Sequence, residues 1–257
     1  MSVTDIAAYM VDGFFGGQRR AFSESVLTYN VSSLPASPRQ YAMKALEAWS
    51  DATGIEFVET DGPARITFRQ EGNVSATYFD IREDEIWSAD VVQSSWMTGV
   101  DWRKQVQNWI HEIGHALGAG HPGEYNGDAD PHLRLFDDDE TSTTVMSYFH
   151  VDQVVRTPQE ADVQAIQMLY GDLGPLNVED DSYLIRDDEH WHFVDEGGVD
   201  TIRAKSDGFL DLTPGASNAL FSTDDGTVIE NLTVDAGSDY SVEIIGNAAD
   251  NIITIIG

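Results

Sequence analysis

The chain has 257 residues, 41% of them hydrophobic, which is enough for one large domain or two smaller ones and too apolar for a disordered protein. Its 45 acidic and 14 basic residues give a formal net charge of -31, and such a surface repels nucleic acid phosphates and anionic lipids. Cysteine is absent, which excludes disulfides, thiolate metal ligands and thiol nucleophiles. We expect a monomer with no nucleic acid partner and no membrane insertion, since no apolar run approaches the roughly 20 residues of a membrane span.

The acidity has two interpretations. It can be a solvated surface that keeps the chain soluble, or some carboxylates can bind calcium, which prefers oxygen ligands. Both can hold together.

The first residues do not read as a signal peptide, because a basic region is missing and Asp5 and Asp12 interrupt the apolar residues. The sequence therefore predicts a protein that stays inside the cell or leaves it without an N-terminal signal.

The first helix is expected from Ser37, as its cap, to Gly54, with Pro38 in the first turn and Gln40 at the capping-box position. Residues rich in Ile, Val, Phe and Thr then predict strands at 55–59, 64–69, 76–81 and 86–90.

A second helix is predicted from Asp101 to Gly118 or Gly120, followed by a long polar loop that reaches Val145. A third helix follows the cap signature at residues 157–160 and ends at Gly171.

The pattern changes near residue 173. Beyond it we find short β-like runs at residues 182–185, 191–194, 228–234 and 252–256, separated by Gly, Asp and Asn. The sequence thus predicts an α+β domain at residues 1–172 and a small all-β domain at residues 173–257.

The segment HEIGHALGAGH at residues 111–121 carries the chemistry. His111 and His115 are four residues apart, so a helix places both imidazoles on one face. His121 can join them only where the chain turns back, which the glycines at 118 and 120 permit. Three imidazoles with an open fourth position suit a catalytic zinc, with Glu112 beside them as general base; the alternative is a helix that happens to carry surface histidines.

Together with Met146-Ser147-Tyr148, these histidines resemble the metzincin metallopeptidases, in which a methionine-containing turn lies beneath the zinc. Within that clan, the HPGEYN segment at residues 121–126 and the helix at residues 161–171 resemble the serralysin family.

The resemblance implies a metzincin-type catalytic domain, with a twisted sheet, an active-site helix and a C-terminal helix. It implies a secreted, extracellular zinc endopeptidase in which Glu112 takes a proton from the attacking water. Tyr148 would be an additional zinc ligand that stabilises the oxyanion, and the segment at residues 76–90 would hold the edge strand that pairs with substrate.

The C-terminal part departs from the family pattern, because serralysins usually carry an array of calcium-binding repeats of the type GGxGxDxUx. Here only eroded copies stand at residues 234–239 and 245–251, so we expect a shortened chain without a full β-roll. Asp195, Gly197 and Asp200 match the DxGxxD calcium segment that serralysins have before their roll; an acidic β-turn is the other interpretation.

Other functions remain open. The chain could be a catalytically silent zinc- and calcium-binding surface or adhesion module, or a non-peptide hydrolase with the same metal site. His132, His150, His190 and His192 lack ligand spacing, and we interpret them as surface or structural residues.

Overall fold

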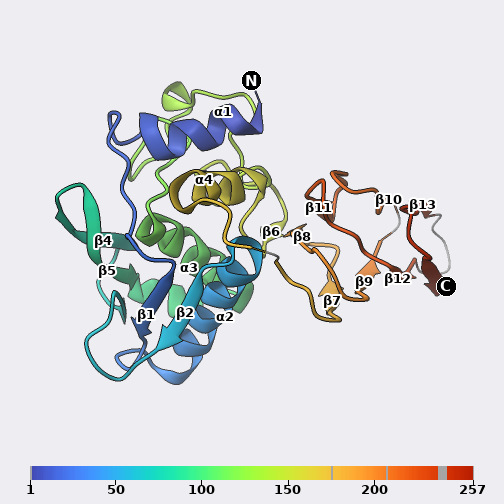
Figure 1. The fold of residues 1–257 in the computed structure, drawn as a ribbon, viewed down its shortest axis with the longest axis horizontal. Coiled ribbons are helices and arrows are strands. Elements are labelled where there is room, and N and C mark those ends of the chain that lie inside the picture. The colour runs from blue at the N-terminus through green and yellow to red at the C-terminus, as the bar shows by residue number, and fades with distance from the viewer. Residues whose placement is uncertain (1, 175, 207, 237–241, 257) are drawn as a thin grey trace. The chain divides into compact units, whose positions relative to one another are not determined.

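A computed structural model describes residues 2–174, 176–206, 208–236 and 242–256. Its contacts divide the chain into two units, the first formed by Met1–Val151 with Thr157–Gly174 and the second by Asp152–Arg156 with Pro175–Gly257. A few helices accompany several sheets, which confirms the mixed helix-and-sheet composition that the sequence predicts (Figure 1).

The described helices all lie in the first unit. They are α1 (Val3–Ala8), the π-helix η1 (Tyr9–Gly13), α2 (Ala36–Thr53), the 3-10 helix η2 (Ser95–Gly99), α3 (Trp102–Leu117), the 3-10 helix η3 (Pro131–Leu133) and α4 (Glu160–Tyr170). Among the residues that the structure describes, no helix is both long and apolar enough to cross a membrane.

The predicted ends of the long helices are mostly confirmed. The side chain of Asp101 accepts the backbone N–H of Arg103 and caps α3, and Gly54 and Gly118 end α2 and α3 with φ of 74° and 108°. The predicted cap at Ser37 is wrong, because the N-cap is Pro35, two residues earlier, and its carbonyl accepts the N–H of Arg39. Gly is suited to both C-terminal positions because it adopts positive φ without strain.

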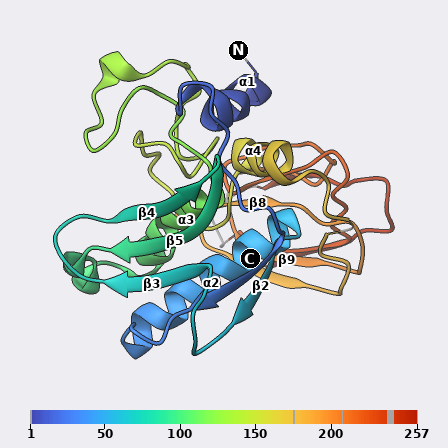
Figure 2. The same ribbon diagram turned by 60° about the vertical axis from the view of Figure 1, so that its left-hand side comes forward.

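The first unit contains a five-stranded sheet in the order β2-β1-β3-β5-β4. Its strands are β1 (Val26–Asn30), β2 (Glu56–Glu59), β3 (Ile66–Gln70), β4 (Ala76–Arg82) and β5 (Glu85–Gln93). The pairs are parallel except that β4, at one edge, runs antiparallel to β5, and the register shifts between Asp80 and Ile81. Helices α2 and α3 pack on each other and against this sheet (Figure 2).

The core between α2, α3 and the sheet is aromatic and aliphatic. Trp49 of α2 and Trp109 of α3 are fully buried, and the indole N–H of Trp49 donates to the carbonyl of Ile110 at 2.9 Å. Trp109 meets Phe68 of β3 edge to face. These contacts hold α3 against the sheet, and α3 carries the first two histidines.

The second unit is wound from short parallel strands. They are β6 (Val154–Val155), β7 (Ser182–Ile185), β8 (Glu189–Phe193), β9 (Thr201–Lys205), β10 (Phe209–Asp211), β11 (Phe221–Thr223), β12 (Asn231–Asp235), β13 (Glu243–Ile245) and β14 (Ile252–Ile256). They form sheets in the orders β14-β12-β9-β7, β11-β8-β6 and β10-β13, and all their pairs are parallel.

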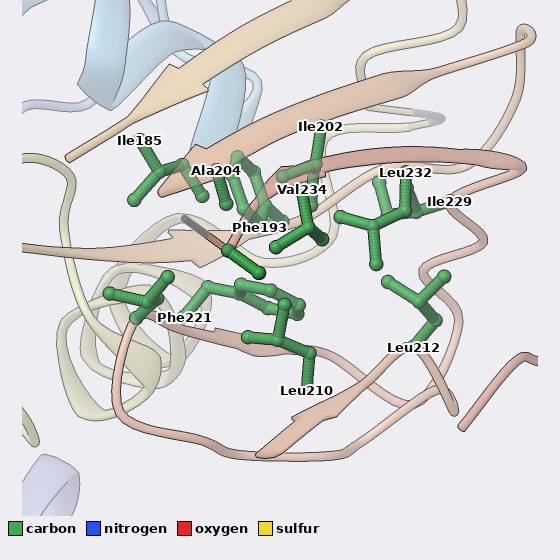
Figure 3. Packing of buried hydrophobic residues seen from close by; sticks show 12 residues of the cluster. Ile185, Phe193, Ile202, Ala204, Leu210, Leu212, Phe221, Ile229, Leu232 and Val234 are labelled. Carbon is green, nitrogen blue, oxygen red and sulfur yellow. The ribbon is translucent and has the colours of Figure 1, made fainter. Parts of the chain in front are cut away.

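Parallel strands normally need a long crossover. Here the segment that connects two paired strands contains a strand of another sheet. For example, β8 lies between β7 and β9 in the sequence but pairs in a different sheet. The apolar residues that face inward, among them Phe221, Leu232 and Val234, form one buried cluster (Figure 3). The β-like runs of the sequence predict β7, β8, β12 and β14, but neither the other strands of this unit nor the parallel winding.

Two predicted features fall partly on residues outside the description. In the repeat-like segment at residues 234–239, residues 237–239 lie outside the described part of the chain. Pro175, at the expected change of character, also lies outside it.

Candidate metal centre

Helix α3 presents His111 and His115 on one face, one turn apart, as their spacing predicts. The chain then leaves the helix at Gly118 and returns, so that the buried side chain of His121 meets the other two. The Nε2 atom of His121 lies 3.0 Å from Nε2 of His115 and 3.4 Å from Nε2 of His111. The structure therefore brings all three predicted histidines together.

The outer nitrogen of each ring faces a backbone carbonyl. His111 Nδ1 lies 2.8 Å from the oxygen of Val145, His115 Nδ1 lies 2.8 Å from that of Ala119, and His121 Nδ1 lies 3.0 Å from that of Tyr125. A carbonyl oxygen can only accept, so each Nδ1 carries a proton and donates it.

It follows that the three Nε2 lone pairs point at one another. Lone pairs this close repel unless a cation lies among them, and a fixed tautomer with a carbonyl partner is the usual second shell of a metal-bound histidine. The donor set therefore fits a divalent metal. Among the described residues, these three histidines are one of two clusters able to hold a metal ion.

Burial keeps the imidazoles neutral. It lowers the pKa of His111 to about 3 and that of His115 to about 4, and it moves the pKa of His121 well below its ordinary value. Neutral rings are the form that binds a metal.

Glu112 is buried beside the histidines, with 4% of its surface exposed. Burial raises the pKa of its carboxyl to about 8. The hydroxyl of Thr77 on β4 lies 2.7 Å from the carbonyl oxygen of Glu112 and 3.2 Å from its Oε2.

The turn that contains Met146 lies under α3. A Cβ at Gly114 would be 2.5 Å from Met146 Sδ and 3.0 Å from Cζ2 of Trp49, so the glycine lets the sulfur approach the helix between the two histidines. Asp162 of α4 fixes the turn, since its carboxylate accepts the hydroxyl of Thr144 at 2.5 Å and the N–H of Val145 at 2.7 Å.

A second buried carboxylate supports His121. Asp139 accepts the hydroxyls of Tyr125, at 2.9 and 3.0 Å, and Ser147, at 2.6 Å. The ring of Tyr125 stacks on that of His121, with centroids 5.4 Å apart. Asp139 thus links the loop that follows α3 to the turn of Met146. The sequence analysis missed it because it lies within an acidic run, DDDE at residues 137–140.

Tyr148 lies beside the histidines. Its ring centroid is 4.5 Å from that of His121 and 5.8 Å from that of His111, and its hydroxyl accepts the N–H of Gly127 at 3.3 Å. Burial, and in addition the charge of Glu112, raise the pKa of the hydroxyl, which therefore stays protonated.

The second cluster lies in the other unit and consists of Asp181, Asp195 and Asp200, whose oxygens lie within 4.8 Å of one another. Burial, with the neighbouring carboxylate of Asp200, raises the pKa of Asp195 to about 8. Among the described atoms, Asp200 Oδ2 is buried without a hydrogen-bond partner. Gly197 donates its N–H to Asp195 Oδ1 at 3.1 Å.

Asp181 is a member of this cluster that the sequence analysis missed. It ends the run EDD at residues 179–181, which looks like ordinary acidic surface. Only the parallel pairing of β7 with β9 brings it beside Asp200, whose Oδ1 accepts its N–H at 2.8 Å.

The other four histidines are not members of the metal-binding cluster formed by the triad. His132 and His150 are exposed, whereas His190 and His192 are buried in β8. The imidazole of His192 lies 2.9 Å from Ser222 Oγ and 3.0 Å from Asp224 Oδ1.

The site matches the metzincin type. It has a helix with two histidines and a glutamate, a third histidine from the returning chain and a methionine turn beneath them.

Comparison with known proteins finds metalloproteases of the serralysin kind. The chain is 27% identical to "Serralysin" of Proteus mirabilis over 267 aligned positions, which cover 83% of this chain and 54% of the relative. It is 26% identical to "Serralysin" of Photorhabdus laumondii subsp. laumondii (86% and 55% covered) and 28% identical to "Metalloprotease AprA" of Pseudomonas entomophila (82% and 53% covered).

In sequence the chain is thus similar to the serralysin metalloproteases, the resemblance that its motifs predict. It spans about half the length of these relatives. No family model matches it.

The close approach of Met146 to Gly114 makes a testable prediction. Alanine normally stabilises a helix relative to glycine by about 1 kcal/mol, but in Gly114→Ala the new methyl group meets Met146 Sδ and Trp49. We expect a loss of roughly 1–3 kcal/mol in the free energy of unfolding, typical of overpacking, measured by urea denaturation. Lys104→Ala, at an exposed position of the same helix, is the control and should change little; a Gly114→Ala variant more stable than the parent would contradict the packing.

Proposed function

We propose that this chain is a secreted zinc-dependent endopeptidase, which hydrolyses internal peptide bonds of proteins with Glu112 as general base. The observation that carries the proposal is the convergence of three neutral imidazoles on one point beside a buried carboxylate. A catalytically silent zinc- and calcium-binding module is the alternative. A purely structural site has no use for the carboxylate of Glu112, which favours the enzyme.

Zinc suits the donor set, because it accepts three imidazoles and keeps a further position open in catalytic sites. His111, His115 and His121 would hold it, with Tyr148 as an additional ligand. When bound, the metal supplies a Lewis acid that polarises water and the substrate carbonyl.

Glu112 performs the proton transfers. Its carboxylate takes the proton from the attacking water and passes it to the amine of the leaving peptide. Burial supports this role, since it raises the pKa of the Glu112 carboxyl above its ordinary value and makes the carboxylate a stronger base.

Tyr148 stabilises the negative charge that develops on the carbonyl oxygen. Its hydroxyl stays protonated and lies on a ring that contacts two of the histidines. A donor of this kind acts most strongly where water is excluded.

The substrate binds as an extended peptide along β4, the edge strand of the five-stranded sheet. Its unpaired backbone groups allow strand addition. Thr77 of this strand contacts Glu112, so a peptide on β4 runs beside the general base.

Residues 1–172 form the catalytic domain in this proposal, and residues 173–257 form a small β domain stabilised by calcium. Asp181, Asp195 and Asp200 would hold the ion, which suits their oxygen-only chemistry. An extracellular location agrees with such a calcium site and with the high acidity of the chain.

The first test concerns the general base. Glu112→Ala should still bind about one zinc per chain but lose roughly 10²- to 10⁴-fold in kcat, the usual contribution of a general base. Casein and a quenched peptide serve as substrates, with and without a zinc chelator, and bound metal is quantified. Glu47→Ala, which removes an exposed carboxylate from α2, should keep full activity. Parent-like turnover by Glu112→Ala would refute the assignment.

The second test concerns Tyr148. Tyr148→Phe keeps the ring contacts and removes the hydroxyl, so we expect kcat to fall by roughly 10²- to 10³-fold, as for other oxyanion donors, with a smaller change in zinc affinity. Steady-state kinetics and zinc competition titrations measure the two effects. Unchanged kinetics would remove Tyr148 from the mechanism.

The third test concerns calcium. Added Ca²⁺ should relieve the repulsion among the buried carboxylates and raise the melting temperature of the second unit by about 5 °C or more. Asp200→Asn should abolish this shift, whereas Asp187→Asn, which removes the same charge from an exposed position, should retain it. Scanning calorimetry across a Ca²⁺ titration measures it, and a parent chain indifferent to Ca²⁺ would rule out the site.

A further inference from the structure

Strand β4 is attached to helix α3 by two hydroxyl groups. Ser75, directly before the strand, donates to Asn108 Oδ1 at 2.8 Å, and Thr77 contacts Glu112. Residues two apart on extended backbone advance about 6.7 Å, and residues four apart on a helix advance about 6 Å. The side chains of residues 75 and 77 therefore match helix positions 108 and 112, which they contact.

The two contacts differ in what they hold. The partner of Ser75 is an amide side chain one turn before the metal site, whereas both acceptors of Thr77 belong to Glu112. The single hydroxyl hydrogen of Thr77 lies within reach of the main-chain oxygen, at 2.7 Å, and of Oε2, at 3.2 Å. The hydroxyl of Thr77 thus bridges the carboxylate and the main-chain carbonyl of Glu112.

This arrangement restricts the rotation of a flexible side chain. Glu112 has three rotatable side-chain bonds, and a base must be held close to its productive geometry for efficient proton transfer. The hydroxyl of Thr77 fixes the position of Oε2, and therefore the orientation of the whole carboxylate group. Among the hydrogen bonds of the described residues, the bond from Thr77 is the one that reaches the carboxylate of Glu112.

We propose that Thr77 is a positioning residue, whose hydroxyl on β4 orients the general base Glu112 for proton transfer. The inference rests on the proposed function and adds to it. It also gives β4 two roles in the proposed mechanism. The strand binds the substrate, and its Thr77 orients Glu112.

The test compares three variants with the parent enzyme. Thr77→Val has nearly the same shape and lacks the hydroxyl; it should bind about one zinc per chain and lose roughly ten- to hundredfold in kcat, as is usual for outer-shell partners, while KM changes less than threefold. Thr77→Ser restores the hydroxyl and should recover kcat to within about threefold of the parent. Ser75→Ala removes the companion contact between β4 and α3 and should keep the parent kcat, even where its melting temperature falls.

Several outcomes would overturn the proposal. They are a kcat of Thr77→Val within twofold of the parent, an equal loss in Ser75→Ala, or no recovery in Thr77→Ser. Thr77→Ala replaces the valine variant under the same criteria where the latter does not fold. Glu112→Ala is measured in parallel: if it is inactive while Thr77→Val is fully active, only this inference fails, whereas an active Glu112→Ala refutes the proposed function itself.

Discussion

The meeting of three imidazole Nε2 atoms, 3.0 and 3.4 Å apart, is the interaction on which the rest of the first unit depends. Three main-chain carbonyls enforce it by accepting hydrogen bonds from the Nδ1–H groups. These carbonyls belong to a helix end, a loop and a turn. Asp139 and Asp162 hold the loop and the turn through buried hydrogen bonds. A long segment with little regular secondary structure is therefore ordered, because its polar groups are satisfied internally.

Much of this site could be predicted from the sequence because its determinants are local. The histidine spacing, the cap at Asp101 and the glycine at 118 lie within one helix and its ends, where a periodic pattern has a direct geometric meaning. Four of the five strands of the first sheet, β2 to β5, lie within a few residues of the ranges that their residues predict. The first 30 residues carry α1 and β1, which were missed, since short elements with interrupted apolar patterns give a weak signal.

The rest could not be predicted because it depends on contacts between distant residues. Strands of two to five residues carry too little pattern to define their pairing, so the parallel winding of the second unit was not expected. Asp181 is recognisable as a member of the acidic cluster only once the pairing of β7 with β9 is known. Likewise, Asp139 and Thr77 are unremarkable in sequence, and their partners lie 14 and 35 residues away.

In the proposed peptidase, the register shift between β4 and β5 limits how much of a peptide this edge can recognise. Asp80 pairs with Ser88 and Ile81 with Ile86, so β5 has one extra residue, which interrupts the ladder locally. The interruption falls shortly before the positive φ angles of Glu83 and Asp84. The regular part, from Ala76 to Asp80, offers a straight ladder of about 16 Å at the usual strand rise. If the chain is the endopeptidase proposed above, its selectivity comes from a short stretch of sequence around the cut bond, and a folded protein needs to expose only one brief unfolded loop to be cleaved.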